Sequence, residues 1–156
     1  MFITEEPSCD ATFDLISGPE YGIPDEALTA SSEDDYVYYV AQESRITSQS
    51  GWSPWVTEGA WIRADLGENR IVVAIRTRGD TVYFVTQFEI SISTDGFEWS
   101  DVVDDFGLTI VFEGNTDGST IVTNQMPTPI ETRFVQLNVQ EMNRCCNGQS
   151  MVVLFN

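Results

Sequence analysis

Apolar and polar residues alternate with a period of two in several stretches, and this pattern constrains the fold more than any other feature of the chain. The clearest stretch is QFEISIST (87–94), in which Phe88, Ile90 and Ile92 occupy every second position. Because successive side chains of a strand point to opposite faces of a sheet, such alternation predicts strands with one buried face. The other alternating stretches are WIRADL (61–66), LTIVFE (108–113) and RFVQLNV (133–139).

Turn residues separate the alternating stretches. Asp95-Gly96 favours a hairpin, because type I′ turns need residues that tolerate positive φ. Pro127 and Pro129 are expected to keep the segment MPTPI out of a central strand. IVVAIRT (71–77) is apolar on both faces, as in a central strand, and SMVVLF (150–155) is expected to be buried. Short strands with frequent turns, and no convincing helical periodicity, predict one all-β domain, either a sandwich or a barrel.

The charge of the chain narrows the class of partner. The sequence has 25 acidic residues against 7 arginines, without lysine or histidine, and a net charge of −18. A field of this sign repels phosphate backbones and anionic headgroups, so we expect no nucleic acid as a partner and consider an anionic membrane disfavoured. No cofactor is required, although the many carboxylates would make calcium binding easy.

The absence of histidine limits catalysis. It removes the Ser-His-Asp and Cys-His nucleophile systems and the usual general base near neutral pH. A pair of carboxylates could still hydrolyse glycosides, but nothing in the sequence singles out such a pair. We therefore expect no enzymatic activity.

Three cysteines leave at least one thiol unpaired or bonded outside the chain. A long-range disulfide from Cys9 to Cys145 or Cys146 is favoured over a bond between the two neighbours, whose ring would be strained. The long-range bond would tie the ends together and indicates an oxidising compartment. The start of the chain shows no secretory signal, and no apolar run approaches the roughly 20 residues of a membrane-spanning helix.

Eight stretches in order resemble a known family. They are ALTASS (27–32), ESRIT (43–47), GWSPW (51–55), AWIRADLG (60–67), AIRTRGD (74–80), FEISISTDGFEW (88–99), FEGNTDG (112–118) and ETRFVQLNV (131–139). Together they resemble the discoidin domain, also called the coagulation factor 5/8 type C domain. The resemblance assigns 9–156 to this domain and leaves 1–8 as an N-terminal extension. It implies a single eight-stranded jelly-roll β-sandwich of the galactose-binding-domain-like type.

The resemblance also implies a setting and a mode of action. Such domains are usually secreted or on a cell surface, and they are not catalytic. Loops at one end of the sandwich bind glycans, phospholipid headgroups, collagen or other proteins, so the fold does not fix the ligand.

The end of the chain departs from the family. Members commonly close on a strand ending in Gly-Cys, whose cysteine bonds the one near the start, whereas this sequence stops at Asn156. Either the fragment is trimmed, or Cys145 or Cys146 has taken over the partnership with Cys9. Some sugar-binding relatives place a glutamate in the last strand as a calcium ligand, and its absence here argues against that calcium site. The residues in its place are Val152, Val153 and Leu154.

The first binding loop implied by the family is 33–43 (EDDYVYYVAQE). A tyrosine offers a flat apolar ring and a hydroxyl, which suits a sugar ring or a protein interface; the alternative is one face of an ordinary strand. The candidate ligand-binding residues are Tyr36, Tyr38 and Tyr39. Three adjacent acids are either a solvated turn or calcium ligands. They are Glu33, Asp34 and Asp35.

The second loop, SQSGWSPWVTEG (48–59), carries two indoles on a stiff Ser-Pro connection. In the family the first tryptophan of this stretch often packs beneath the loop, so Trp52 is expected to be structural. Trp55 is the better candidate for ligand contact. Trp61 and Trp99 lie in alternating stretches and are predicted to be core residues.

The third loop begins with Arg78-Gly79-Asp80, the tripeptide that many extracellular proteins offer to integrins. Relatives place a glycine at this strand exit, so Gly79 has a backbone reason to exist, and we consider an integrin the less favoured partner. Arg78 is expected at the rim, where its guanidinium could grip a carboxylate or sugar hydroxyls. Its replacement by alanine should weaken binding with little change in stability. Asp80, Tyr83 and Phe84 are further candidate ligand-binding residues. Tyr83 and Phe84 form either a protruding apolar tip or the start of the next strand.

The preferred function is therefore a non-catalytic extracellular recognition or cell-adhesion module. Its partner would be a glycan, or a cell-surface or extracellular-matrix protein. One alternative is a calcium-assisted phospholipid-binding module. The other is a targeting domain of a larger carbohydrate-active or matrix protein.

Overall fold

Two long antiparallel strands, β2 (Trp61–Arg78) and β6 (Val122–Met142), form the frame of the molecule. The computed structural model describes residues 13–34, 38–143 and 154–155. Within these ranges there are two 3₁₀ helices and no α-helix, in agreement with the all-β prediction. The other elements are η1 (Asp25–Ala27), β1 (Leu28–Ala30), η2 (Ala41–Ser44), β3 (Val85–Ser93), β4 (Ser100–Asp101), β5 (Phe112–Glu113) and β7 (Leu154–Phe155).

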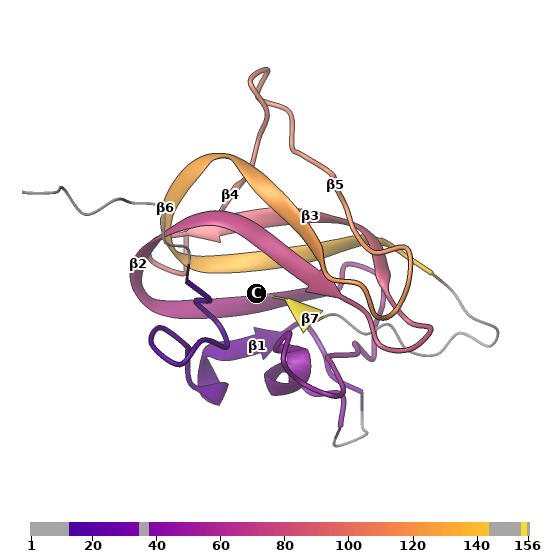
Figure 1. Cartoon of the computed structure of the whole chain (residues 1–156). Helices are drawn as coiled ribbons and strands as arrows, with labels where there is room; N and C mark the ends of the chain where they lie inside the picture. Colours follow the sequence, from indigo (N-terminus) through magenta and orange to yellow (C-terminus); the bar gives the residue numbers. More distant parts are fainter. Residues whose placement is uncertain (1–12, 35–37, 144–153, 156) are drawn as a thin grey trace, which may run out of the picture.

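β2 and β6 bend together, and the bend folds one sheet into two layers (Figure 1). Residues 61–65 of β2 pair with β6 in one layer, and pairing resumes in shifted registers at residues 70–72 and 74–77. Gly67, with a φ of 81°, lies in the first gap between registers. Left-handed backbone of this kind favours glycine, which explains this residue at the bend.

Pro127 and Pro129 lie inside β6, so the prediction that they exclude this segment from a central strand was wrong. They fall between Gln125 and Ile130, where β6 has no partner residue in β2. A proline has no backbone N–H to give to a ladder, and here none is required. The prolines therefore mark the bend of the strand and not its end.

The strands pair in the order β1-β2-β6-β3-β4, while β5 pairs with β3 and β7 pairs with β2. The predicted jelly-roll sandwich is confirmed, with seven strands among the described residues instead of eight. Of the stretch LTIVFE (108–113), only Phe112 and Glu113 are strand residues, and they form β5. Thr109 instead forms an isolated bridge with Val103, at the base of a projecting hairpin.

The core is built from the alternating positions that the sequence predicts. In β3, Phe88 and Ile90 are buried, and the Phe88 ring stacks on Phe112 of β5 at 5.5 Å. The buried positions of the two long strands include Ile62, Ala64, Leu66, Val135, Leu137 and Val139. Burial of this set on one face supplies the main hydrophobic stabilisation of the sandwich.

Trp61 and Trp99 are half-buried, so their assignment to the core was wrong. The guanidinium of Arg63 lies between them, 4.5 Å from the Trp61 ring and 4.2 Å from the Trp99 ring. Both indoles therefore make cation–π contacts with Arg63 on the outer face of the sheet. Burial lowers the pKa of Arg63, but an arginine stays charged at any physiological pH.

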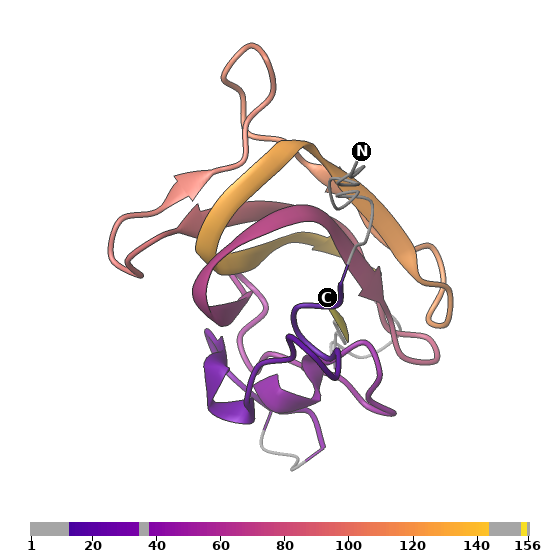
Figure 2. The same ribbon diagram turned by 60° about the vertical axis from the view of Figure 1, so that its left-hand side comes forward.

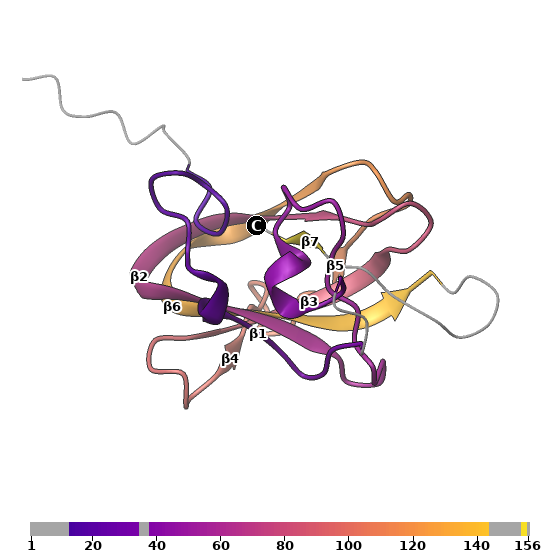
Figure 3. The ribbon, with the colours of Figure 1, turned by 90° about the horizontal axis from the view of Figure 1, so that it is seen from below.

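Because β2 turns back on itself, both of its ends lie at one end of the sandwich, together with the start of β3 and the end of β6. We call this the loop end. Its segments are 31–60, which contains the first and second predicted binding loops, 79–84, which is the third loop, and 114–121. Figure 2 shows the segment between β4 and β5 projecting from the body of the sandwich, away from the loop end. Figure 3 shows β1 and the two 3₁₀ helices covering the underside of the sandwich.

The three cysteines, the proposed disulfide and the N-terminal extension lie outside the described residues. So do Tyr36, Asp35, Val152 and Val153. The described part of the chain contains no helix that is long and apolar enough to cross a membrane.

Candidate functional site

The first two loops of the loop end are held together by backbone hydrogen bonds. The Asp34 amide donates to the Ser53 carbonyl at 2.9 Å, and the Ser53 amide donates to the Tyr39 carbonyl at 3.0 Å. Trp52 is fully buried, and its Nε1 donates to the Ser32 carbonyl at 2.8 Å. The prediction that Trp52 is structural is therefore confirmed, and the described residues of the two loops form one hydrogen-bonded unit.

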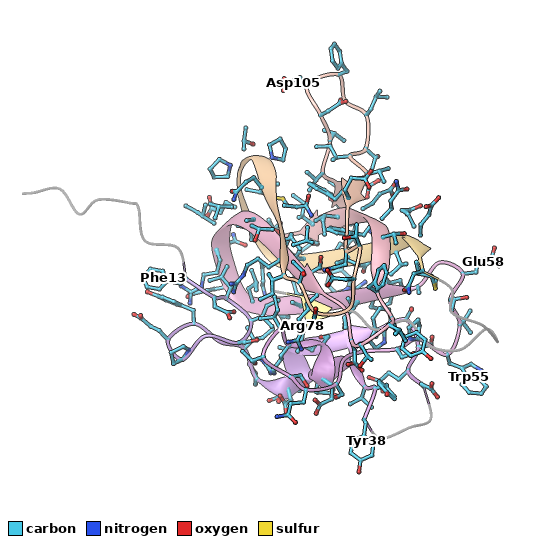
Figure 4. All side chains as sticks on the ribbon, turned by 45° about the vertical axis from the view of Figure 1, so that its right-hand side comes forward. Phe13, Tyr38, Trp55, Glu58, Arg78 and Asp105 are labelled. Atoms are coloured by element: carbon cyan, nitrogen blue, oxygen red, sulfur yellow. The ribbon has the colours of Figure 1, made fainter. Side chains whose placement is uncertain are left out.

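Two aromatic side chains project from this unit into solvent. Tyr38 is 72% exposed and Trp55 is 67% exposed. Figure 4 shows both pointing outward on the same side of the molecule. Tyr38 is next to Tyr39, and Trp55 is two residues after Ser53. Because Tyr39 and Ser53 are joined by a backbone hydrogen bond, the backbone that carries both aromatic side chains is held in place. Tyr39 itself is half-buried.

The predicted acidic ligands are partly used by the fold. One oxygen of Glu33 accepts the Ala41 amide at 2.8 Å and so closes the first loop. Asp34 is half-buried, and Asp35 is not among the described residues. Within the described ranges, no group of three or more His, Cys, Asp or Glu side chains is arranged to hold a metal ion.

Arg78 joins the end of β2 to the second loop. Its Nη2 donates to the Ser48 carbonyl at 2.7 Å, and its Nε is buried without a hydrogen-bond partner. The Glu43 carboxylate accepts the hydroxyl groups of Ser48 and, at 3.1 Å, of Ser50. The side chain of Arg78, which was expected at the rim, is therefore half-buried and hydrogen-bonded within the protein.

The third loop is a tight hairpin. The Asp80 and Tyr83 backbones exchange two hydrogen bonds of 2.8 Å, and Thr81 has a φ of 51°. A Cβ on Gly79 would lie 2.4 Å from the Tyr83 carbonyl oxygen and 2.6 Å from the Phe84 Cβ. The backbone reason expected for Gly79 is therefore confirmed, and it is close approach of neighbouring atoms.

This hairpin answers the question raised by the Arg-Gly-Asp tripeptide. Gly79 is buried, Arg78 turns toward Ser48, and the backbone of Asp80 closes the turn. Arg78 joins the end of β2 to the second loop, whereas Gly79 and Asp80 form the third loop itself. Tyr83 and Phe84 are half-buried at the base of the same hairpin.

Two polar residues that the sequence analysis did not single out support the loop end, Asn143 at the third loop and Asn115 at the loop 114–121. The Asn143 Oδ1 accepts the Phe84 amide at 2.7 Å, and its Nδ2 donates to the Val82 carbonyl. The buried Asn115 donates to the Thr77 carbonyl at 3.2 Å and the Thr120 carbonyl at 2.7 Å. The contacts of Asn143 with Phe84 and of Asn115 with Thr77 join distant parts of the chain, so no local sequence pattern indicated them.

Asp117 organises the loop that follows. It accepts the Thr120 amide at 2.6 Å and the Ser119 amide at 2.8 Å. These backbone hydrogen bonds, with the Thr120 hydroxyl, lower the pKa of Asp117 to about 2. Because hydrogen bonding to the charged form favours ionisation, this turn carries a negative charge at neutral pH.

The described carboxyl groups with a displaced pKa do not suit proton transfer. The pKa of Asp65 is lowered by hydrogen bonding from Arg133, and that of Asp95 by the Glu98 and Phe97 amides. A general acid at neutral pH needs a raised pKa. These carboxyl groups are therefore ionised at neutral pH, because hydrogen bonding to the charged form favours ionisation.

Comparison with known proteins agrees with this geometry. The family model for the F5/8 type C domain matches residues 27–151. Neuropilin-1 of Gallus gallus is 31% identical over 163 aligned positions, which include 97% of this chain and 17% of that protein. Coagulation factor V of Mus musculus is 26% identical over 88% of this chain and 7% of its own length. The chain thus spans less than a fifth of these relatives.

Solved structures show the same fold. Discoidin II of Dictyostelium discoideum superposes with a TM-score of 0.67 at 22% identity, covering 82% of this chain and 52% of its own. A Clostridium perfringens domain, solved in complex with GalNAc-β-1,3-galactose, gives a TM-score of 0.64 at 18% identity, covering 83% of this chain and 91% of its own. With the family model matched over most of its length, this chain belongs to the F5/8 type C, or discoidin, domain family.

Proposed function

We propose that this domain is a non-catalytic extracellular recognition module that binds a glycan or a protein through its loop end. The observation that carries the proposal is the pair of exposed rings, Tyr38 and Trp55, on a hydrogen-bonded loop unit. Rigid aromatic side chains provide large contact area at low entropic cost, and their rings suit sugar faces and protein interfaces alike. The exposed Val56 adds apolar surface beside Trp55.

The family supports a binding role, and two similar structures were solved with a bound sugar. One is the Clostridium perfringens domain with GalNAc-β-1,3-galactose, and another, from NanJ of the same organism, was solved with galactose at a TM-score of 0.59 and 17% identity. The relative neuropilin-1 is a much longer protein, which fits a targeting or recognition domain within a larger chain. An extracellular setting is part of the proposal and follows the family.

The charge of the loop end bears on the choice of ligand. Glu33, Glu58 and Asp117 are exposed there, whereas Arg78 is engaged by Ser48. This balance disfavours anionic headgroups unless calcium bridges them. A calcium-assisted phospholipid module is therefore the second candidate, and the test below includes it.

A glycan array with the wild-type domain and three alanine variants tests the proposal. We expect Trp55→Ala and Tyr38→Ala to weaken binding by about tenfold or more, as aromatic contact residues do. Phe97→Ala is the matched control, because Phe97 is 88% exposed but lies on the β3–β4 hairpin. Equal loss in all three variants would contradict a site at the loop end.

If the array shows no ligand, the same variants are tested on immobilised extracellular-matrix proteins. Vesicles of phosphatidylserine, with and without calcium, distinguish the second candidate. Calcium-dependent binding to these vesicles that Trp55→Ala abolishes would replace glycan or protein recognition by membrane recognition.

A further inference from the structure

A second exposed apolar feature lies away from the loop end, on the hairpin between β4 and β5. Val103 and Thr109 form an isolated antiparallel bridge at its base. Figures 1 and 2 show this hairpin projecting from the body. In Figure 4, Asp105 lies at its tip, on the opposite side of the molecule from Tyr38. We call residues 103–109 the outer hairpin.

The tip of the outer hairpin is fixed by one side chain. Asp104 Oδ1 accepts the amides of Phe106 and Leu108, each at 2.9 Å. The Asp104 amide donates to the Leu108 carbonyl at 2.9 Å, and the Asp104 carbonyl accepts the Gly107 amide at 3.0 Å. Gly107 has a φ of 78°, which a glycine adopts without strain. The tip is therefore preorganised.

This rigid tip holds apolar side chains in solvent. Phe106 is 89% exposed and Leu108 is 66% exposed, while Val102, at the base, is buried in the core. The tip residues thus contribute almost nothing to packing of the fold. A projecting aromatic ring with fixed backbone has the form of an anchor that fills a pocket on another molecule.

The charge around the ring indicates what kind of pocket would accept it. Asp104 and Asp105 precede Phe106 directly, and Asp101 at the base is exposed. The sequence contains no basic residue between Arg78 and Arg133, so no cation of this segment offsets these acids. Complementary partners of such a surface carry arginine or lysine at the rim of the apolar contact.

We propose that the outer hairpin is a protein-binding anchor, and that its partner is a protein with an apolar pocket rimmed by arginine or lysine. Phe106 fills the pocket, Leu108 covers its edge, and Asp105 faces the basic rim. A bilayer fits less well, because insertion of Phe106 would bring Asp104 and Asp105 against anionic headgroups, which repel them. This surface is separate from the loop end, so it does not depend on the function proposed there.

A phage library of random disulfide-cyclised peptides tests the proposal. It is selected on the immobilised wild-type domain, with counter-selection on Phe106→Ser. We expect enriched sequences in which arginine or lysine flanks apolar residues. A resynthesised peptide should bind wild-type and Phe97→Ser equally, and Phe106→Ser about tenfold or more weakly. Asp105→Asn and added salt should weaken it less, because rim charges are partly screened.

Three outcomes would overturn the proposal. One is a failure to enrich any peptide that distinguishes wild-type from Phe106→Ser. Another is an enriched set that lacks basic residues, or that keeps its affinity when arginine and lysine are replaced by glutamate. The third is binding of the domain to phosphatidylcholine vesicles that Phe106→Ser abolishes, which would assign the outer hairpin to a membrane. Circular dichroism of Phe106→Ser verifies that the variant is folded.

Discussion

The loop end and the outer hairpin both expose aromatic rings on rigid backbone, but they become rigid in different ways. The loop end depends on contacts between residues far apart in sequence, such as Arg78 with Ser48 and Trp52 with Ser32. The outer hairpin depends on Asp104 and its four following residues. A site of the first kind is coupled to the stability of the whole domain, and a site of the second kind is not.

The largest expected effect is at Trp52, which supports both loops from below. Trp52→Ala removes a fully buried indole and its hydrogen bond to Ser32, and should lower the free energy of unfolding by about 3–5 kcal/mol. Trp55→Ala, the matched control on the exposed side, should change it by less than about 0.5 kcal/mol. Urea unfolding measures both. An equal change in unfolding free energy for the two variants would contradict a structural role for Trp52 and a ligand-contact role for Trp55.

Arg78 is expected to have the next largest effect. Arg78→Ala removes the hydrogen bond to the Ser48 carbonyl and should destabilise the domain by roughly 1–2 kcal/mol, because a charged donor is lost. The sequence alone suggested little change in stability, and the contact with Ser48 is the reason for the revision. Arg76→Ala is the control, since its ion pair with Asp14 is long, at 3.6 Å, and partly exposed. A Tm for Arg78→Ala as close to wild type as that of Arg76→Ala would contradict a linking role.

Asp104→Ala tests the local character of the outer hairpin. It should leave the unfolding free energy within about 1 kcal/mol of wild type, because the hairpin packs little against the core. Hydrogen exchange at the Phe106 and Leu108 amides should nevertheless accelerate strongly, since both lose their acceptor. Asp105→Ala should leave this exchange unchanged. A global loss of protection in Asp104→Ala would show that the hairpin is coupled to the sheet.

The smallest effect is expected at Asp117, a local turn within the loop end. Its folded pKa is lowered to about 2, so the stabilisation by its ionised form is complete above the unfolded pKa, near 3.8, and is lost as pH falls toward about 2. NMR titration should place the Asp117 carboxyl midpoint near 2. Acid unfolding of Asp117→Asn should lack this contribution. An Asp117 midpoint near 3.8 would show that the hydrogen bonds of the turn do not stabilise the ionised carboxyl group.

Sequence reasoning was most successful where a pattern of residues has a single structural explanation. Alternation predicted β3 and the paired halves of β2 and β6, because a half-buried strand requires it. It was wrong at Pro127 and Pro129, since a missing N–H can mark a bend as well as an end. It was also wrong for Trp61 and Trp99, because alternation does not reveal that Arg63 can cover two indoles on an outer face.

The candidate site was predictable in outline only. The family resemblance indicated the three loops, and Tyr38 and Trp55 are exposed there. The contacts of Asn115 with Thr77 and of Asn143 with Phe84 were not predictable, because the residues that they join are distant in sequence. The stretch LTIVFE (108–113) was predicted to alternate as one strand, but only Phe112 and Glu113 are strand residues, and Leu108 and Thr109 belong to the outer hairpin.

By itself, the sequence determined that the chain forms a β-sandwich of this family and carries a strong negative charge, because periodicity, turn residues and charge are local or additive properties. Only the tertiary structure decided which aromatic rings support the loops and which reach solvent. It also decided that Arg78 binds Ser48 instead of standing free at the rim. The reason is that burial and hydrogen-bond partners depend on residues brought together from distant positions, and one-dimensional patterns do not contain those distances.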